Sequence, residues 1–340
     1  MDQIVQFLEQ LAGTAVSFDM RISGPFILST IILSFGIWWF TARQGDDRKS
    51  FLSFLLPKDV YAHKSNLLDI KLYLTNRLIA FLGVTGALVF TPVVAYKVLV
   101  VLTEITTGEW QLPPQTWTRV AIATLLIVMA SDFCKYWAHR LHHEWDALWP
   151  FHAVHHSAEV LTPLTVARAH PIEGFIRLLF ISVFVGVLQG VLVWAFVGTT
   201  SPITIAGANV FYFIFNAAGG NLRHSHIWLS YGRIVEHIFI SPAQHQIHHS
   251  RATEHFNKNY GSMFAIWDWM FGTLYVPAKR ETLTFGVAEA DGTPIQQPYE
   301  TLGAALFKPF IESSQAIFRS WRRRSEKRPI VERRASKADP

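Results

Sequence analysis

Long apolar stretches separated by short polar segments dominate the first two thirds of the chain. A helix that crosses the hydrocarbon core of a membrane needs about 20 mostly apolar residues. Five stretches approach this pattern, at residues 24–40, 78–102, 117–137, 175–198 and 202–218. The last is the weakest and fits either a fifth span or half of a hairpin. The pattern predicts an all-α, multi-pass membrane protein with about four or five transmembrane helices.

Composition supports the membrane interpretation. The chain has 340 residues, of which 50% are hydrophobic and 16% are charged, whereas soluble domains carry about 25% charged residues. Cys134 is the single cysteine, which excludes a disulfide framework within the chain and a cluster of zinc thiolates. The first residues, MDQIVQFLEQ, have neither a cationic start nor a small-residue cleavage site, so we expect no cleaved signal peptide.

The distribution of charge predicts an orientation. Residues 41–77 carry seven Lys and Arg, whereas residues 103–116 carry none. Cytoplasmic loops are enriched in Lys and Arg. We therefore expect residues 41–77, 139–174 and 219–340 to face the cytoplasm, in a bacterial inner membrane rather than the endoplasmic reticulum.

Three regions follow from this organisation. They are an N-terminal region of membrane helices with a basic loop, a catalytic domain, and a C-terminal segment with a basic tail, over residues 1–116, 117–280 and 281–340. The tail from Arg319 to Lys337 has nine Lys and Arg against two Glu. Such a run is either a disordered, solvated end or a patch that binds anionic lipid headgroups. The membrane accounts for the net charge of +5, and we expect no nucleic-acid partner.

Histidines are concentrated in the predicted catalytic domain. Fourteen of the fifteen lie between His139 and His255. Three groups stand out, in the segments HRLHH (residues 139–143), HAVHH (152–156) and HQIHH (245–249). Chance does not readily place such groups at the ends of apolar helices, where ionisable side chains are costly and usually functional.

The spacing of these histidines suits metal binding. Helix residues three and four apart share a face, so each group can direct two or three imidazoles to one point. Imidazole is a common ligand for Fe, Zn, Cu and Ni. The groups supply eight nitrogens, from His139, His143, His152, His155, His156, His245, His248 and His249. Eight ligands are too many for one ion and suit two ions that leave positions open for oxygen or water.

Acidic residues and isolated histidines lie near the three groups. Asp132, Tyr136, His139 and His143 share one helical face by their spacing. Asp132 can either orient a ligand histidine through its second ring nitrogen or make a helix-end or headgroup contact. Taken singly, His63, His142, His226, His237 and His255 are better explained as ordinary polar residues.

Six segments together resemble the fatty acid hydroxylase/sterol desaturase superfamily. They are HRLHH, LWPFHAVHHS, RAHPIE, NLRHSH, SPAQHQIHHS and NYGSMFAIWDWMFGT, within residues 125–277. The resemblance implies an integral membrane oxygenase with a histidine-held dinuclear centre, normally iron, in a cytoplasmic helical cap. It also implies that His224, in NLRHSH, is a further ligand. His170 is implied as a ligand or an outer-shell residue, and Asp268 as a residue of a mainly structural closing motif that can hydrogen-bond around the site.

The resemblance implies a function as well. Members use O2 to hydroxylate or desaturate C–H bonds of sterols, fatty acyl chains and alkyl lipids. We therefore expect two iron ions, which zinc can replace on purification, and O2 as co-substrate. The chain shows no fused cytochrome b5 segment, so we expect a separate electron donor of the cytochrome b5, ferredoxin or reductase type.

Two functions from other classes compete with this one. A metal transporter would place ionisable residues at several depths of its helices, whereas here the histidine groups cluster on one side. A zinc hydrolase would use water in place of O2, but the chain has no HExxH segment and no glutamate inside a histidine group.

Overall fold

A computed structural model of the chain describes residues 2–14, 23–41, 50–84, 86, 90–106, 116–197 and 202–326. Within these residues the secondary structure is helical apart from isolated bridges, which confirms the predicted all-α class. The longer helices are α1 (Asp2–Thr14), α2 (Gly24–Thr41), α5 (Asn66–Phe81), α6 (Thr91–Ile105), α7 (Trp117–Glu144), α8 (Trp149–His156), α9 (Pro171–Leu192), α10 (Pro202–Ala217) and α13 (Leu302–Glu326). The shorter ones are α3 (Phe51–Leu55), α4 (Lys58–Tyr61), α11 (Pro242–His248) and α12 (Ile266–Met270), with short turns η2 (Pro163–Ala167), η3 (Val193–Val197), η4 (Gly220–His224), η5 (Val235–His237) and η6 (Thr253–His255).

Three helices of the described part are long and apolar enough to cross a membrane. They are α2, α7 and α9, the last continuing through the π-helical turn η3 to Ala195. The predicted span at residues 78–102 is not one helix. Its residues are divided between α5 and the 15-residue α6, with a break after Phe81 and with Pro92 in the first turn of α6, where a proline is well tolerated. The helix predicted at residues 202–218 is present as α10, but it has only 16 residues.

Helices α6 and α9 pack against each other through two glycines. A Cβ atom on Gly186 would lie 2.7 Å from Val94 Cβ, and one on Gly190 would lie 2.7 Å from the Ala95 carbonyl oxygen. Small residues four apart let helices approach closely in a membrane. The two helix backbones therefore approach each other along the face that carries these glycines.

Alanine at Gly190 should separate this pair of helices. We expect Gly190→Ala to lower stability by about 1–3 kcal/mol, the usual cost of an overpacked contact, because the clash is with backbone as well as side chain. Gly174→Ala, in the same helix with nothing within 4 Å of the added atom, is the control. Thermal unfolding of both variants in detergent measures the difference, and equal losses would contradict the close-contact explanation.

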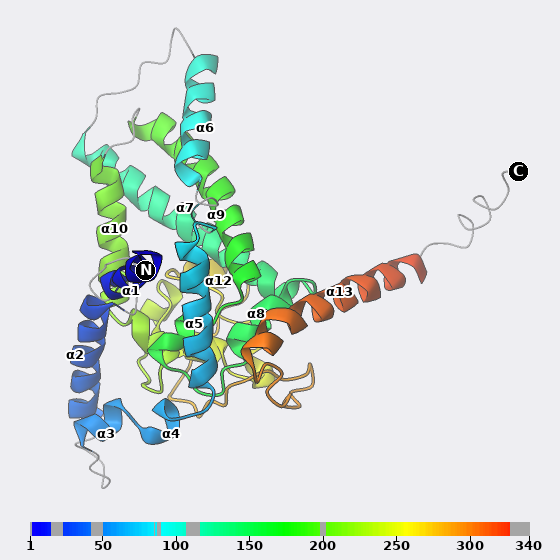
Figure 1. Ribbon diagram of the computed structural model, residues 1–340. Helices are drawn as coiled ribbons and strands as arrows, with labels where there is room; N and C mark the ends of the chain where they lie inside the picture. Colours follow the sequence, from blue (N-terminus) through cyan, green and yellow to red (C-terminus); the bar gives the residue numbers. More distant parts are fainter. Residues whose placement is uncertain are drawn as a thin grey trace, which may run out of the picture.

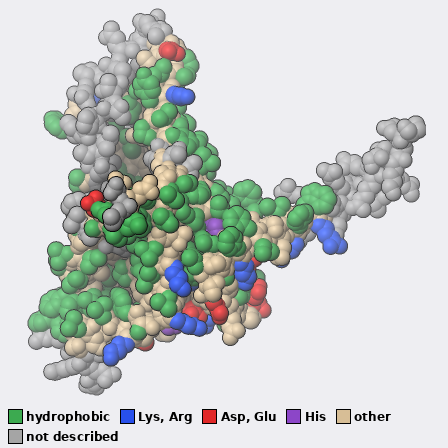
Figure 2. Space-filling model, viewed as in Figure 1, with side chains coloured by type: hydrophobic (Ala, Val, Ile, Leu, Met, Phe, Trp, Pro, Cys, Tyr) green, Lys and Arg blue, Asp and Glu red, His purple; other side chains and the backbone are tan. Residues whose placement is uncertain are grey.

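Below the apolar helices, shorter elements form a cap (Figure 1). Helix α8 follows the C-terminal end of α7, and α12 packs beside the middle of α7, where Trp267 contacts Asp132 and Phe133. A cluster of buried hydrophobic residues around Tyr136, Tyr260, Met263 and Trp267 joins α7 to the cap. On the face in Figure 2, hydrophobic side chains cover much of the upper part, and most charged side chains gather lower down.

The C-terminal helix α13 extends away from the body (Figure 1). Its first half packs on α8 and α5, where Ser313 Oγ donates to the Ala147 carbonyl at 2.7 Å. One prediction for the basic tail was disorder, but its first residues, 319–326, are helical and continue α13. Residues 327–340 of that tail lie outside the described residues.

Candidate metal centre

The first histidine segment ends the long helix α7, whereas the second and third stand on short helices whose starts are marked by the local sequence. His139 and His143 occupy the last two turns of α7. Helix α8 begins with a proline in its first turn, and α11 begins at Ser241, which forms a capping box with Gln244 and precedes Pro242. A serine that is followed directly by proline, with glutamine three residues after the serine, is a strong helix-start signal. The sequence therefore fixes where the second and third groups enter their helices.

Nine histidines converge as two sets, which we call the five-histidine group and the four-histidine group. Within each group one ring nitrogen of every member lies within 4.8 Å of those of all the others. The five-histidine group contains His139, His143, His152, His156 and His248, and the four-histidine group contains His155, His224, His245 and His249. All nine residues that the sequence singled out are brought together, and none is left apart.

Each of the three histidine segments, HRLHH, HAVHH and HQIHH, directs two of its imidazoles to one place. The pairs spaced by four residues stay together, namely His139 with His143, His152 with His156, and His245 with His249. His155 of HAVHH joins the four-histidine group, and His248 of HQIHH joins the five-histidine group. The cause is the helical rotation of about 100° per residue, which turns His155 away from His156 and His248 away from His249.

The ring nitrogens that face inward lie too close together for imidazoles with no ion between them. His139 Nε2 lies 3.1 Å from His152 Nε2, and His224 Nε2 lies 3.1 Å from the Nε2 atoms of both His245 and His249. Two nitrogens that bind the same ion, each at about 2.1 Å, lie roughly 3.0–3.4 Å apart. The spacing inside both groups is thus the spacing of metal ligands.

For three of the histidines, the outer ring nitrogen has a backbone partner that sets the tautomer. The Nδ1 atoms of His139, His155 and His248 lie 2.8–3.1 Å from the carbonyl oxygens of Tyr260, Arg168 and Lys258. His152 Nδ1 lies 3.1 Å from the Glu173 carboxylate. A carbonyl only accepts, so the Nδ1 atoms of His139, His155 and His248 donate, and their Nε2 atoms present lone pairs inward. Lone pairs that face one another at 3.1 Å repel unless a cation lies between them, so these residues fit a bound metal.

Burial also keeps the cap histidines neutral. It lowers the pKa of His155 and of His248 to about 4. It lowers the pKa of His245 and of His249 well below the usual value, and neighbouring histidines add to the effect. Metal binding requires neutral imidazole, so at pH 7 these side chains are already in the ligand form.

Asp268 lies outside both groups and supports the five-histidine group at one remove. Its carboxylate accepts hydrogen bonds from the backbone N–H groups of Tyr260 and Gly261 and from Thr273 Oγ1. Burial raises the pKa of Asp268 to about 6, and these hydrogen bonds act in the opposite direction. The Tyr260 carbonyl in turn holds His139, so Asp268 fixes the segment that orients that histidine.

Asparagine at Asp268 should loosen this segment. We expect Asp268→Asn to cost about 2 kcal/mol of stability, because an NH2 group would replace one of two oxygens that face three donors. Asp291→Asn is the control, because that carboxylate is exposed and accepts from the N–H of the nearby Thr293. Thermal unfolding compares the two, and an unchanged melting temperature for Asp268→Asn would contradict the role.

Asp132 and His170 also lie outside the two groups. Asp132 Oδ2 accepts from Phe264 N–H at 2.9 Å and from Trp267 Nε1 at 3.2 Å. These contacts are with the segment that follows HQIHH. His170 caps α9 by accepting from Ile172 N–H, and its Nε2 lies 3.0 Å from the Leu306 carbonyl of α13. Both ring nitrogens of His170 are thus engaged with backbone, and the residue joins α13 to the start of α9.

Other histidines make ordinary polar contacts. His226 Nε2 lies 2.7 Å from the Phe54 carbonyl, and His237 Nδ1 lies 2.6 Å from the Arg233 carbonyl. His255 pairs with Glu281 at 3.0 Å. His142 is buried with its Nδ1 against the Ala138 carbonyl, four residues back in α7. None of these four belongs to either group among the described residues.

The sequence analysis did not identify two residues that contact the candidate ligand histidines. Glu173 binds His152, and its place in RAHPIE, three residues after His170, was the available signal. Arg168 is fully buried and holds His155 through its backbone carbonyl. Its guanidinium bonds Asp69, Ser65, Ser157 and the Val154 carbonyl. No sequence spacing predicts these contacts, because Asp69 lies 99 residues away.

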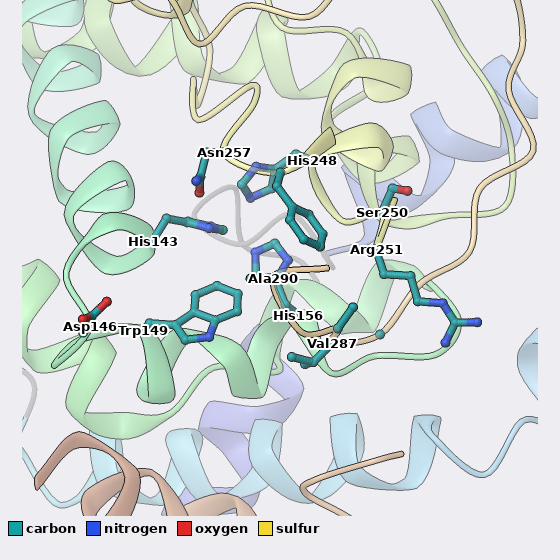
Figure 3. Close-up of a pocket in the computed structure, with 13 residues that line it drawn as sticks. His143, Asp146, Trp149, His156, His248, Ser250, Arg251, Asn257, Val287 and Ala290 are labelled. Carbon is teal, nitrogen blue, oxygen red and sulfur yellow. The ribbon is translucent and has the colours of Figure 1, made fainter. Parts of the chain in front are cut away.

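Two cavities border the histidines and share no lining residue. The first, of about 220 Å³, is lined by His143, His156 and His248 together with cap residues such as Trp149 and Arg251 (Figure 3). In that view the three imidazoles point toward a common space. The second, of about 130 Å³, is lined by histidines of both groups and by residues of α7, α9 and η4. Only the second cavity touches both groups.

Comparison with known proteins gives one family. The sequence model of the family described as fatty acid hydroxylase matches residues 124–273. An ornithine lipid hydroxylase from Rhizobium tropici is 30% identical over 56% of this chain and 54% of its own length. Human alkylglycerol monooxygenase is 28% identical over 51% of this chain and 35% of its own. A Delta(7)-sterol 5(6)-desaturase from Aspergillus fumigatus is 28% identical over 54% of this chain and 60% of its own.

These matches bear on the competing functions. The chain spans about half the length of the ornithine lipid hydroxylase and about a third of the human monooxygenase. No solved structure matches. The relatives are hydroxylases, monooxygenases and desaturases, so the transporter and hydrolase alternatives gain no support. The matched region contains both histidine groups in full, and residues 124–273 form a fatty acid hydroxylase domain by this match.

Proposed function

We propose that the nine histidines hold two metal ions, one in each group, and that the ions are iron. The observation that carries this proposal is the set of inward-facing Nε2 atoms 3.1–3.3 Å apart, in which outward hydrogen bonds to backbone carbonyls fix the rings of His139 and His155. Nitrogen ligands suit iron and zinc alike, and the family supports iron. When bound, the pair would supply the activation of O2 that oxidation of an inert C–H bond requires.

We propose that the substrate is a lipid and that the reaction is hydroxylation or desaturation of an unactivated C–H bond. The names of the relatives support both outcomes, since they include lipid hydroxylases and sterol desaturases. The side chains of residues 117–280, our proposed catalytic domain, would hold the ligand histidines neutral and oriented. Apolar helices beside the second cavity would keep the lipid chain away from water.

We also propose a cytoplasmic position for the cap and a separate protein as electron donor. The seven Lys and Arg of residues 41–77 support this sidedness. The reaction consumes two electrons beyond those of the C–H bond when O2 is reduced. Cytochrome b5-type, ferredoxin-type and reductase-type donors all remain candidates.

We further propose that α13 lies in the plane of the membrane surface. Its exposed apolar side chains Phe307, Ile311, Phe318 and Trp321 follow one face at spacings of four, seven and three residues. The charged residues Lys308, Glu312 and Arg319 follow another face. A helix of this kind buries its apolar face in the headgroup boundary, and nearby basic residues attract anionic lipid.

A labelling experiment tests this position of α13. In full-length protein without Cys134, a fluorophore at Phe318→Cys should be quenched by brominated lipid in nanodiscs that contain anionic lipid. A fluorophore at Ser320→Cys, on the other side of the helix, should be quenched much less. Equal quenching at the two positions would contradict an in-plane helix.

Lipid analysis of cells tests the proposed function. A strain that lacks the protein is compared with one that expresses it and with one that expresses His248→Ala. We expect a lipid that is heavier by one oxygen, or lighter by two hydrogens, only with the active protein and only in the presence of O2. A purified protein without iron, together with no such lipid, would contradict the proposal.

A further inference from the structure

Three cationic side chains surround the second cavity, the one that touches both histidine groups. Lys135 reaches it from α7, Arg177 from α9 and Arg223 from η4. Lys135 stands one helical turn before His139, and Arg223 directly precedes His224. Lys135 and Arg177 lie within α7 and α9, which are candidate membrane spans. Ionisable residues at such positions are costly, and they generally face cavities that serve a function.

Arg223 is the most informative of the three. Its residue is 3% exposed, and its Nε atom is buried without a hydrogen-bond partner among the described residues. The guanidinium lies 4.7 Å from the centre of the Phe215 ring, a contact that orients it without using its donors. A buried donor left unpaired is expensive, and arginine is the side chain best suited to carboxylate and phosphate. The vacant donor indicates an anionic ligand.

The charge around the cavity agrees with that indication. Glu173 is the one acidic residue among those that line it, and its carboxylate already binds His152 at 3.1 Å. Asp132 lies near Lys135 and Arg223, but Oδ2 of Asp132 is taken by Phe264 and Trp267. Lys135 Nζ lies 4.1 Å from the centre of the Tyr212 ring, which steadies the ammonium group while leaving its charge. Cations therefore outnumber carboxylates at the surface of the cavity.

We propose that this cavity binds the anionic group, a carboxylate or a phosphate, of the lipid substrate, with Arg223 as the principal contact and Lys135 and Arg177 as supporting charges. The cavity of about 130 Å³ is well below the roughly 300–1,000 Å³ of sites that enclose a whole small molecule. It therefore holds one end of the lipid, and the chain extends between the apolar helices.

The position of this anion site selects the bond that reacts. Histidines of both groups line the same cavity, so a lipid held by its anionic end presents the carbons nearest that end to the metal centre. This consequence rests on the proposed function, whereas binding of the anion does not. The structure thus assigns an anionic lipid that is oxidised close to its charged end, in preference to an uncharged sterol or a chain oxidised at its middle.

Equilibrium binding to full-length protein in uncharged nanodiscs tests the site without turnover. Three single-chain amphiphiles of equal length are compared, namely hexadecyl phosphate, hexadecanoate and hexadecanol. With no reductant present, we expect at least one of the two anions to bind roughly 10-fold or more tightly than the alcohol, because a charge-assisted pair is worth about 1.5–3 kcal/mol. The anion that binds more tightly identifies the headgroup.

Variants locate the binding. Arg223→Gln and Lys135→Gln should each remove most of the preference for the anion while both metal ions stay bound. Arg251→Gln, which alters the first cavity instead, should leave the preference intact. Lys135→Gln also provides a test if Arg223→Gln fails to fold. Equal binding of anion and alcohol to the unchanged protein would overturn the proposal, and so would a loss in Arg251→Gln as large as in the other two. Anion binding without any O2-dependent product would contradict the proposed function and leave the site standing.

Discussion

Alanine at His224 is expected to lower the metal content of the purified protein from two ions to about one per chain and to abolish lipid oxidation. His224 is the centre of the four-histidine group. Its Nε2 lies 3.3 Å from that of His155 and 3.1 Å from those of His245 and His249. Loss of an outer-shell partner already costs about 10–100-fold in metal affinity or activity. Loss of this central ligand should cost at least about 100-fold.

The same short motif supplies the control. His226 stands two residues later in RHSH, and its Nε2 lies 2.7 Å from the Phe54 carbonyl, away from both groups. His226→Ala should therefore keep both ions and most of the activity. Elemental analysis of iron and zinc per chain, with turnover measured on the same samples, separates the variants. Two retained ions in His224→Ala, or one lost ion in His226→Ala, would show that the grouping is wrong.

Methionine at Arg168 is expected to cost about 3–5 kcal/mol of stability. The Arg168 guanidinium is fully buried, and it pairs with Asp69 Oδ1 at 2.9 Å. It also donates to the Val154 carbonyl and to Ser157 Oγ. Removal of one member of a buried ion pair leaves the other charge without compensation. Thr165 alone would still donate to Asp69.

A second substitution shows whether the lost charge is the cause. Asp69→Asn combined with Arg168→Met should recover part of the stability, because no buried charge would then remain. Lys308→Met removes a member of the exposed Lys308–Glu312 pair at 3.6 Å, and we expect it to cost less than about 1 kcal/mol. Melting temperatures in detergent rank the three variants. No recovery in the double variant would assign the effect to lost packing instead.

The loss of Arg168 should also reach the four-histidine group. The Arg168 carbonyl holds His155 Nδ1 at 3.1 Å, and the guanidinium ties that backbone to α5 through Asp69. Helix α5 therefore supports the four-histidine group although it contributes no member to it among the described residues. Weaker binding of one of two ions in Arg168→Met would reveal this connection.

The predictable part of the structure is the part that depends on neighbouring residues. Apolar length predicted α2, α7 and α9, and the spacing of four residues predicted the pairs His139–His143 and His152–His156. Local spacing could not predict that His155 joins His224, which lies 69 residues away. The partition of HAVHH between two groups follows from helical rotation only once the place of each partner is known.

Backbone contacts were the other unpredictable part. Tyr260 and Lys258 hold histidines through carbonyl oxygens, and a carbonyl leaves no trace in residue identity. The break between α5 and α6 was missed because residues 78–102 are mostly apolar, and apolar length alone does not show where a helix stops. Glu173 could have been predicted as a supporting residue, because it is a carboxylate three residues after His170 in RAHPIE.

The most direct test of the central claim is the mass of the lipid product formed under ¹⁸O2. Iron-loaded full-length protein is reconstituted with an electron donor and membrane lipid, with His224→Ala as the inactive control. We expect a lipid that carries one ¹⁸O atom, or one that has lost two hydrogens, in amounts that depend on O2 and on two bound iron ions. A protein that holds two iron ions, accepts electrons and leaves every lipid mass unchanged would contradict it.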